Sequence, residues 1–291
     1  MVETFLKYLS FEKRYSHHTI EAYRKDLQQF VEYLNTDFEI SDICDVTHTH
    51  IRGWVVSLMD SGLSPKSVNR KIATLKSFYK FLMAREYLDI NPASQIKPLK
   101  TKKDLPVFVK EDEIINLLDQ VEFSDDFSGV RDKLILELLY STGIRLAELQ
   151  GLKEADVNFY ENTIRVLGKR NKERIIPVGN SLIQLIGNYQ NLKKEQGMTG
   201  DKLLATNTGA ALYPMYIYRK VKSYLNAVTT LSKRSPHVMR HTFATHLLNK
   251  GADLNAVKDL LGHTSLAATQ VYTHNSIEKL KAAFDQAHPK A

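Results

Sequence analysis

Residues 235–241, with the sequence SPHVMRH, have the composition of a helix N-terminus that could bind an anion. Ser235 is a favourable N-cap, and Pro236 suits the first helical position. His237 then lies in the first turn and Arg240 one turn later, beside free backbone amides and the positive end of the helix dipole. This arrangement suits a phosphate group. Taken alone, the histidine and the arginine could equally form an ordinary surface pair.

Two more candidates follow this helix. Gly251 is expected to end it, Asp253 to cap the next helix, and Gly262 to terminate that one. His263 therefore stands directly after a sharp helix end. Tyr272 is expected near the end of a further short helix, and by itself it is more typical of a half-buried packing residue than of a nucleophile.

Arg145 and Lys169 are candidates from earlier in the sequence. Arg145 could bind phosphate, or it could only pair with Glu148 at helical spacing. Lys169 lies between two segments rich in β-branched residues, 163–167 and 174–178, which predict a β-hairpin with a basic tip. It could be an ordinary exposed turn lysine, so each of these signals is weak in isolation.

The chemistry of these residue types favours displacement at a phosphodiester. Negative charge grows on the nonbridging oxygens, and an arginine stays charged and can bind two of them at once. No carboxylate cluster that would hold magnesium accompanies the basic segments, so no metal or other cofactor is predicted. A zinc site built from His237, His241 and His246 is a weaker alternative, because Val238 stands where a HExxH protease has its glutamate.

The elements that would position these residues fall into two predicted domains. Apolar residues recur at helical spacing between residues 4 and 34 and predict two helices separated near Ser16. A further helix, from residue 64 to 85, carries basic residues and no acid. Residues 96–106, rich in lysine and proline, predict an extended linker. The fold class is mainly α: a helical domain, then a mixed α+β domain that is mostly helical with a small antiparallel sheet.

Length and composition agree with this organisation. A chain of 291 residues fits two domains at roughly 100 to 200 residues each. The net charge of +7 favours a polyanionic partner without requiring one. Candidate DNA contacts are the basic side chains of the helix and linker: Lys66, Arg70, Lys71, Lys76, Lys100, Lys102 and Lys103.

Cys44 is the single cysteine, which excludes an intrachain disulfide and a cysteine-based zinc site. The N-terminus lacks the pattern of a signal peptide, and no apolar run approaches the ~18 residues that would span a bilayer. We therefore expect a soluble cytoplasmic protein without a membrane partner.

Four segments together resemble a known family: TGIRLAEL, LGKRNKERIIPVG, HVMRHTFATHLL and LLGHTSLAATQVYTH. Their order and approximate spacing are those of the tyrosine recombinase (phage integrase) family, and they are most similar to its XerC/XerD branch. Residues 1–95 resemble the family's SAM-like core-binding domain, 96–106 its interdomain linker and 107–291 its catalytic domain. Arg170 stands where relatives often have glycine, and Ala267-Ala268 replaces a more polar pair; neither departure removes a chemical group.

The resemblance implies a role for each candidate. Tyr272 would be the nucleophile and Lys169 the acid that protonates the leaving oxygen. The residues around the phosphate would be Arg145, His237, Arg240 and His263. The product would be a 3'-phosphotyrosine and a free 5'-hydroxyl, which allows religation without a cofactor.

The resemblance also implies partners. These are double-stranded DNA with paired half-sites, and a tetramer of this chain with itself or with a paralogous recombinase. The apolar stripe of Ile277, Leu280 and Phe284 further predicts that the last helix, residues 276–286, docks on a neighbouring subunit. A role in resolving chromosome dimers would involve the FtsK translocase. Two alternatives remain: an integrase or excisionase of a phage or mobile element, and a noncatalytic DNA-binding protein.

Overall fold

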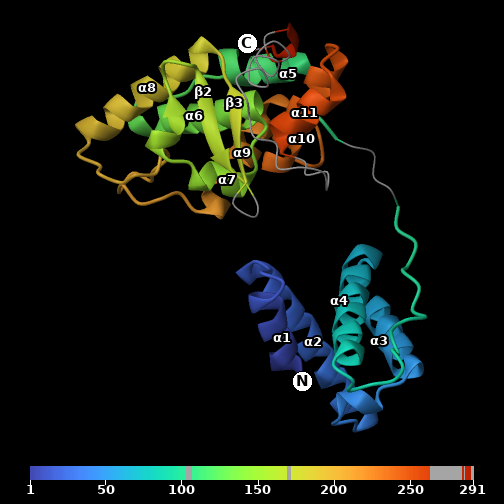
Figure 1. The fold of residues 1–291 in the computed structure, drawn as a ribbon. Helices are drawn as coiled ribbons and strands as arrows, with labels where there is room; N and C mark the ends of the chain where they lie inside the picture. Colours follow the sequence, from blue (N-terminus) through green and yellow to red (C-terminus); the bar gives the residue numbers. More distant parts are fainter. Residues whose placement is uncertain (103–106, 169–171, 263–283, 285, 290–291) are drawn as a thin grey trace. The chain divides into compact units, whose positions relative to one another are not determined.

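A computed structural model of the chain describes residues 1–102, 107–168, 172–262, 284 and 286–289. The chain divides into two compact units, Met1–Asp104 and Leu105–Ala291 (Figure 1). Within the described residues, no helix is both long enough and apolar enough to cross a membrane.

The N-terminal unit is a bundle of four α-helices: α1 (Val2–Phe11), α2 (His17–Phe38), α3 (His48–Asp60) and α4 (Pro65–Ala84), with a short 3-10 turn at Ile43–Asp45. The side chain of Ser16 caps α2 and that of Ser64 caps α4. The bundle core is apolar and aromatic, and includes the fully buried Phe30, Trp54 and Phe78.

The N-terminal unit continues past residue 95, where the linker was expected to begin. Ile96 is buried in its core. The Asn69 side chain on α4 donates to the Leu99 carbonyl at 2.9 Å and accepts from the Leu99 amide at 2.7 Å. The first residues of the predicted linker are therefore held by α4, because their apolar side chains and backbone groups find partners there.

The C-terminal unit is built around α6 (Phe127–Thr142), almost every residue of which is buried. The helices around it are α5 (Glu111–Ile115), α7 (Leu146–Gly151), α8 (Asn180–Glu195), α9 (Pro214–Val228), α10 (Pro236–Asn249) and α11 (Leu254–Leu261), with a π-helical turn at Asn116–Gln120 and a 3-10 turn at Glu154–Asp156. Helices α8, α9 and α10 pack directly on α6. The apolar core of the unit thus fixes the two helices, α10 and α11, that carry or precede candidate residues.

A three-stranded antiparallel sheet, in the order β1-β2-β3, completes this unit. Strand β2 (Thr163–Leu167) pairs with β3 (Glu173–Pro177) from Thr163 opposite Pro177 to Leu167 opposite Glu173. The predicted hairpin is confirmed, with β3 starting one residue earlier than expected. The sequence did not predict β1 (Val157–Asn158), which is too short to have a periodic pattern. The predicted fold class is confirmed.

Candidate active site

Helix α10 positions Arg240 inside the C-terminal unit. Ser235 accepts a hydrogen bond from the Val238 amide, and Pro236 occupies the first turn, so the predicted helix start is confirmed. Arg240 is buried, whereas His237, one turn earlier, is exposed. Burial therefore distinguishes two residues that their spacing alone had grouped as a pair.

The Arg240 guanidinium bonds to the backbone at two helix ends. It donates to the Gly143 carbonyl and, at 2.7 Å, to the Leu261 carbonyl. Gly143 ends α6 in the left-handed conformation, and a Cβ atom there would lie 2.4 Å from the Phe243 ring, so only glycine fits. Burial lowers the pKa of Arg240 to about 10, and the positive charges of Arg145 and Arg174 add to the effect. The group stays charged at neutral pH.

Arg145 meets Arg240 at the same carbonyl. Arg145 is the residue before α7, and it donates to the carbonyls of Leu261 and Gly262 at 3.5 Å each. Because both arginines reach the Leu261 oxygen, their guanidiniums lie next to each other although they are 95 positions apart in the sequence. Arg145 keeps 30% of its side chain exposed, so this arginine pair is open to an anion from solvent.

Glu148 holds Arg145 in place. Its carboxylate accepts from the Arg145 side chain at 2.8 Å and from the Arg145 backbone amide at 2.8 Å. Arg174 on β3 donates to both oxygens of the same carboxylate, at 3.2 and 2.8 Å. Burial alone would raise the pKa of Glu148, but the bonds from Arg174 and Arg145 outweigh it and lower the pKa to about 2. The carboxylate is therefore ionised.

Sequence reasoning missed Arg174. From the sequence, Glu148 was expected only as a possible partner of Arg145. That ion pair is present, and Arg174 is the second partner of the same carboxylate. A usable signal was present, because Arg174 shares a strand face with the buried Ile176, and a charged residue on an inward face requires a buried partner.

Three predicted catalytic residues, Lys169, His263 and Tyr272, lie outside the described residues, as does Lys103. The residues directly before the first two are described. Gly168 closes the hairpin by donating to the Lys172 carbonyl at 2.7 Å, and Gly262 ends α11 in the left-handed conformation, as predicted.

The histidines of the zinc alternative do not gather into one site. Both ring nitrogens of His246 have protein partners, the Tyr140 hydroxyl and the Val109 carbonyl, each at 2.9 Å. Across the part of the chain that is described, no group of three or more His, Cys, Asp or Glu side chains could hold a metal ion.

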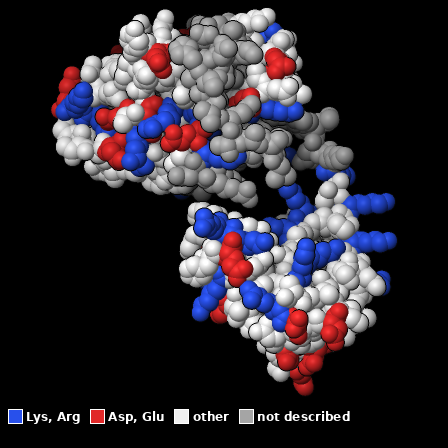
Figure 2. All heavy atoms as spheres, in the orientation of Figure 1, with Lys and Arg blue, Asp and Glu red and all other residues white. Residues whose placement is uncertain are grey.

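The basic residues of the N-terminal unit differ in exposure. Figure 2 shows Lys and Arg gathered toward one end of this unit and Asp and Glu toward the other. The exposed or half-buried members of the predicted DNA-contacting set are Lys66, Arg70, Lys76, Lys100 and Lys102. These side chains remain available to a phosphate backbone.

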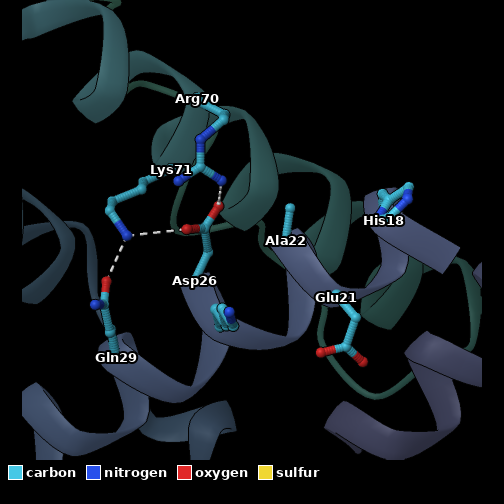
Figure 3. Close-up of a pocket in the computed structure, with 8 residues that line it drawn as sticks. His18, Glu21, Ala22, Asp26, Gln29, Arg70 and Lys71 are labelled. Carbon is cyan, nitrogen blue, oxygen red and sulfur yellow. Dashed lines mark hydrogen bonds and ion pairs between the residues drawn. The ribbon is translucent and has the colours of Figure 1, made fainter. Parts of the chain in front are cut away.

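Lys71 requires a correction. It is 5% exposed, and its ammonium donates to Asp26 on α2 at 2.9 Å and to Gln29 (Figure 3). Asp26, itself 1% exposed, also accepts from Arg70 and from Thr74. A buried lysine with its own carboxylate cannot contact DNA without breaking that pair, so Lys71 is a structural residue.

Comparison with protein families accounts for both units. The model of the phage integrase family matches residues 107–279, and that of the phage integrase N-terminal SAM-like domain matches residues 2–86. The chain belongs to the phage integrase family. Among curated relatives, the tyrosine recombinase XerC of Chlorobaculum tepidum is 36% identical over 99% of this chain and 94% of its own, and that of Staphylococcus aureus strain MSSA476 is 39% identical over 99% and 96%.

Solved structures agree on the fold. A XerH site-specific recombinase bound to a palindromic difH substrate matches with a TM-score of 0.75 at 24% identity, over 97% of this chain and 82% of that one. The curated XerC relatives and the family model confirm the resemblance to the XerC/XerD branch, and the chain is a site-specific tyrosine recombinase of the Xer type, an enzyme that cuts and rejoins DNA.

Proposed function

We propose that this recombinase cleaves DNA through Tyr272, with Arg145 and Arg240 binding the phosphate that is attacked. The observation that carries the proposal is the convergence of these two guanidiniums on the Leu261 carbonyl. Two adjacent forks of N–H donors match the nonbridging oxygens of a phosphodiester and the charge that grows there during displacement.

The remaining roles follow from the family. The Tyr272 oxygen forms a bond to phosphorus, and the bond from phosphorus to the 5' oxygen breaks. An unperturbed phenol has a pKa of ~10, so a base must take its proton, and His237 is exposed at the start of α10 and able to do so. Lys169 gives a proton to the departing 5' oxygen, and His263 donates a hydrogen bond to the phosphate. The 3'-phosphotyrosine keeps the bond energy needed for religation.

A nicked half-site tests this chemistry. The protein should form a denaturant-stable adduct with such DNA. Cleavage releases the short fragment between the cleavage site and the nick, and once this fragment with its 5'-hydroxyl diffuses away, religation fails. Tyr272→Phe should abolish the adduct, and Tyr160→Phe, which alters an almost fully exposed tyrosine, should not. Noncovalent binding by the unaltered protein without any adduct would instead support the noncatalytic DNA-binding alternative.

We propose a duplex with paired half-sites as the substrate. The candidate phosphate contacts of the N-terminal unit and linker are Lys66, Arg70, Lys76, Lys100, Lys102 and Lys103. A tetramer on DNA, of this chain or of this chain with a paralogue, fits the family, as does a cytoplasmic role in resolving chromosome dimers with the FtsK translocase. An integrase of a phage or mobile element would use the same chemistry. Sequencing the DNA held in trapped adducts distinguishes this role from the resolution of chromosome dimers, because the two roles use different DNA sites.

We further propose that the end of the chain exchanges between subunits. Phe284 is buried in the core of its own C-terminal unit, and His288 packs on it and against the Tyr140 and Phe243 rings. The same aromatic contacts could be made to a neighbour. Truncation after Asn275 should then impair tetramer formation more than binding to one half-site, and normal tetramers from the truncated chain would contradict the exchange.

A further inference from the structure

The Arg174 side chain is buried and fully engaged within the protein. It is 4% exposed. Its Nε donates to the Leu260 carbonyl at 2.8 Å, and its two terminal nitrogens donate to the two oxygens of Glu148. Since both of its terminal nitrogens are held by a carboxylate, whereas those of Arg240 bond only to neutral carbonyls, Arg174 is not placed to bind substrate itself.

The surroundings of Arg174 join three segments that lead to proposed catalytic residues. A Cβ atom on Gly168, the residue before Lys169, would lie 3.8 Å from Arg174 and 3.6 Å from Glu148. A Cβ atom on Gly262, the residue before His263, would lie 3.2 Å from Arg174. The Arg174 side chain of β3 therefore lies beside Gly168 at the end of β2, beside the end of α11 and against the carboxylate that holds Arg145.

We propose, resting on the function proposed above, that Arg174 is a positioning residue that keeps the hairpin bearing Lys169 in place against the arginine pair. The Glu148–Arg174 ion pair lies beside Gly168, within van der Waals distance of a Cβ atom placed there, so the position of this pair limits how closely residue 168 can pack. Proton delivery to the 5' oxygen depends on where that hairpin lies, and a misplacement of about 1 Å can cost 10²-fold in rate.

Arginine is required because three acceptors must be reached at once. A lysine at this position keeps the positive charge and one bond to Glu148. It cannot also donate to Leu260 from a separate nitrogen along the side chain, because its only donors are on the terminal ammonium. Arg174→Lys thus weakens the contacts of residue 174 with Glu148 and Leu260 without leaving Glu148 as an uncompensated buried charge.

The test compares two leaving groups. Nicked half-site DNA is prepared with either the natural 5' oxygen or a 5'-bridging sulfur at the scissile phosphate. A thiolate is a good leaving group that needs no protonation, so sulfur removes the need for the acid. Arg174→Lys should slow adduct formation at least about tenfold on the oxygen substrate and approach the unaltered rate on sulfur, with half-site affinity within about twofold.

Arg165→Lys is the matched control. Arg165 lies on the neighbouring strand β2, is 51% exposed and pairs with Asp156, so its replacement should leave both rates unchanged. Gly168→Val adds a side chain next to Glu148 and Arg174 and changes no charge. It should reproduce the pattern of Arg174→Lys, which keeps the test available if Arg174→Lys does not fold.

Equal slowing of Arg174→Lys on both substrates would overturn the inference, as would unaltered rates for Arg174→Lys or Gly168→Val on the oxygen substrate. Lys169→Ala separates this failure from that of the proposed function. A Lys169→Ala enzyme that sulfur does not rescue would contradict the proposed acid role itself. A rescued Lys169→Ala beside an unrescued Arg174→Lys would overturn only the role of Arg174.

Discussion

Each unit of this recombinase has a buried carboxylate that binds two basic side chains, Asp26 in the first unit and Glu148 in the second, and the two clusters differ in their surplus of positive charge. In the N-terminal unit, Asp26 binds the exposed Arg70, the buried Lys71 and the Thr74 hydroxyl. In the C-terminal unit, Glu148 binds the half-exposed Arg145 and the buried Arg174.

The C-terminal arrangement has a third cation. Arg240 lies beside the pair, and the bonds described for it go to neutral carbonyls. The lowered pKa of Arg240 reflects its burial first and then this crowding of positive charge. The Asp26 cluster keeps one surplus positive charge and joins α2 to α4, whereas the cluster around Glu148 keeps two, more of which an incoming phosphate would neutralise.

Replacing Arg240 should have the largest effect on activity and a small one on stability. Arg240→Gln should lower the rate of adduct formation by about 10²- to 10³-fold, because one donor to the transition state is lost. The melting temperature should not fall, since a buried charge without a carboxylate partner is removed. Adduct kinetics and a melting curve on the same sample measure both, and a large loss of stability would mean that this arginine is as structural as Arg174.

Glu148→Gln should destabilise the protein by about 3 kcal/mol at neutral pH, because the buried Arg174 loses its counterion. Because folding lowers the pKa of Glu148, the contribution of this residue to the free energy of unfolding decreases as the pH falls. Glu148 contributes its stability above its ordinary pKa of 4.5, and the contribution is lost as pH falls toward about 2. Denaturant unfolding at several pH values should show the unaltered protein and the variant converging over that range, and a constant difference would contradict this account.

Asp26→Asn should cost less, about 2 kcal/mol, because Lys71 keeps its bond to Gln29. The loss should appear as faster amide hydrogen exchange in α2 and α4 of the full chain. The rate of adduct formation at saturating DNA should not change. A slowed cleavage rate under those conditions would show that the two clusters are not separate in function.

Replacing Arg70 and Lys71 should give the smallest and most selective effects. Arg70→Met should reduce the slope of log Kd against log salt concentration by about 1, as expected for one lost phosphate contact. Lys71→Met should leave the slope unchanged and lower only the melting temperature. Titrations of one half-site at several salt concentrations measure the slope, and a changed slope for Lys71→Met would restore it to the DNA-contacting set.

Local signals in the sequence predicted the elements well where a cap and a stop were both present. Ser235 with Pro236 gave the start of α10, and Asp253 with Gly262 gave both ends of α11. Such signals involve neighbours in the chain, so they can be read without knowing the fold. The hairpin was predicted for the same reason, since its strands pair across a short turn.

Partners far apart in sequence could not be predicted in the same way. Lys71 and Arg70 are adjacent, similar in type and both bonded to Asp26, yet helix geometry buries Lys71 and leaves Arg70 exposed. Arg174 and Glu148 are 26 positions apart and meet only because the β2–β3 hairpin packs on α7 through β2. The family motifs identified Arg145 and Arg240, but which buried groups hold them depends on packing that no local pattern encodes.

The carbonyls that receive Arg145 and Arg240 have a consequence for how tightly DNA is held. Both guanidiniums already donate to backbone carbonyls at the ends of α6 and α11. Where a phosphate oxygen takes the place of one of these carbonyls, the number of hydrogen bonds changes little. The gain is the replacement of a neutral dipole by a full negative charge, and such a gain weakens as dissolved ions screen it.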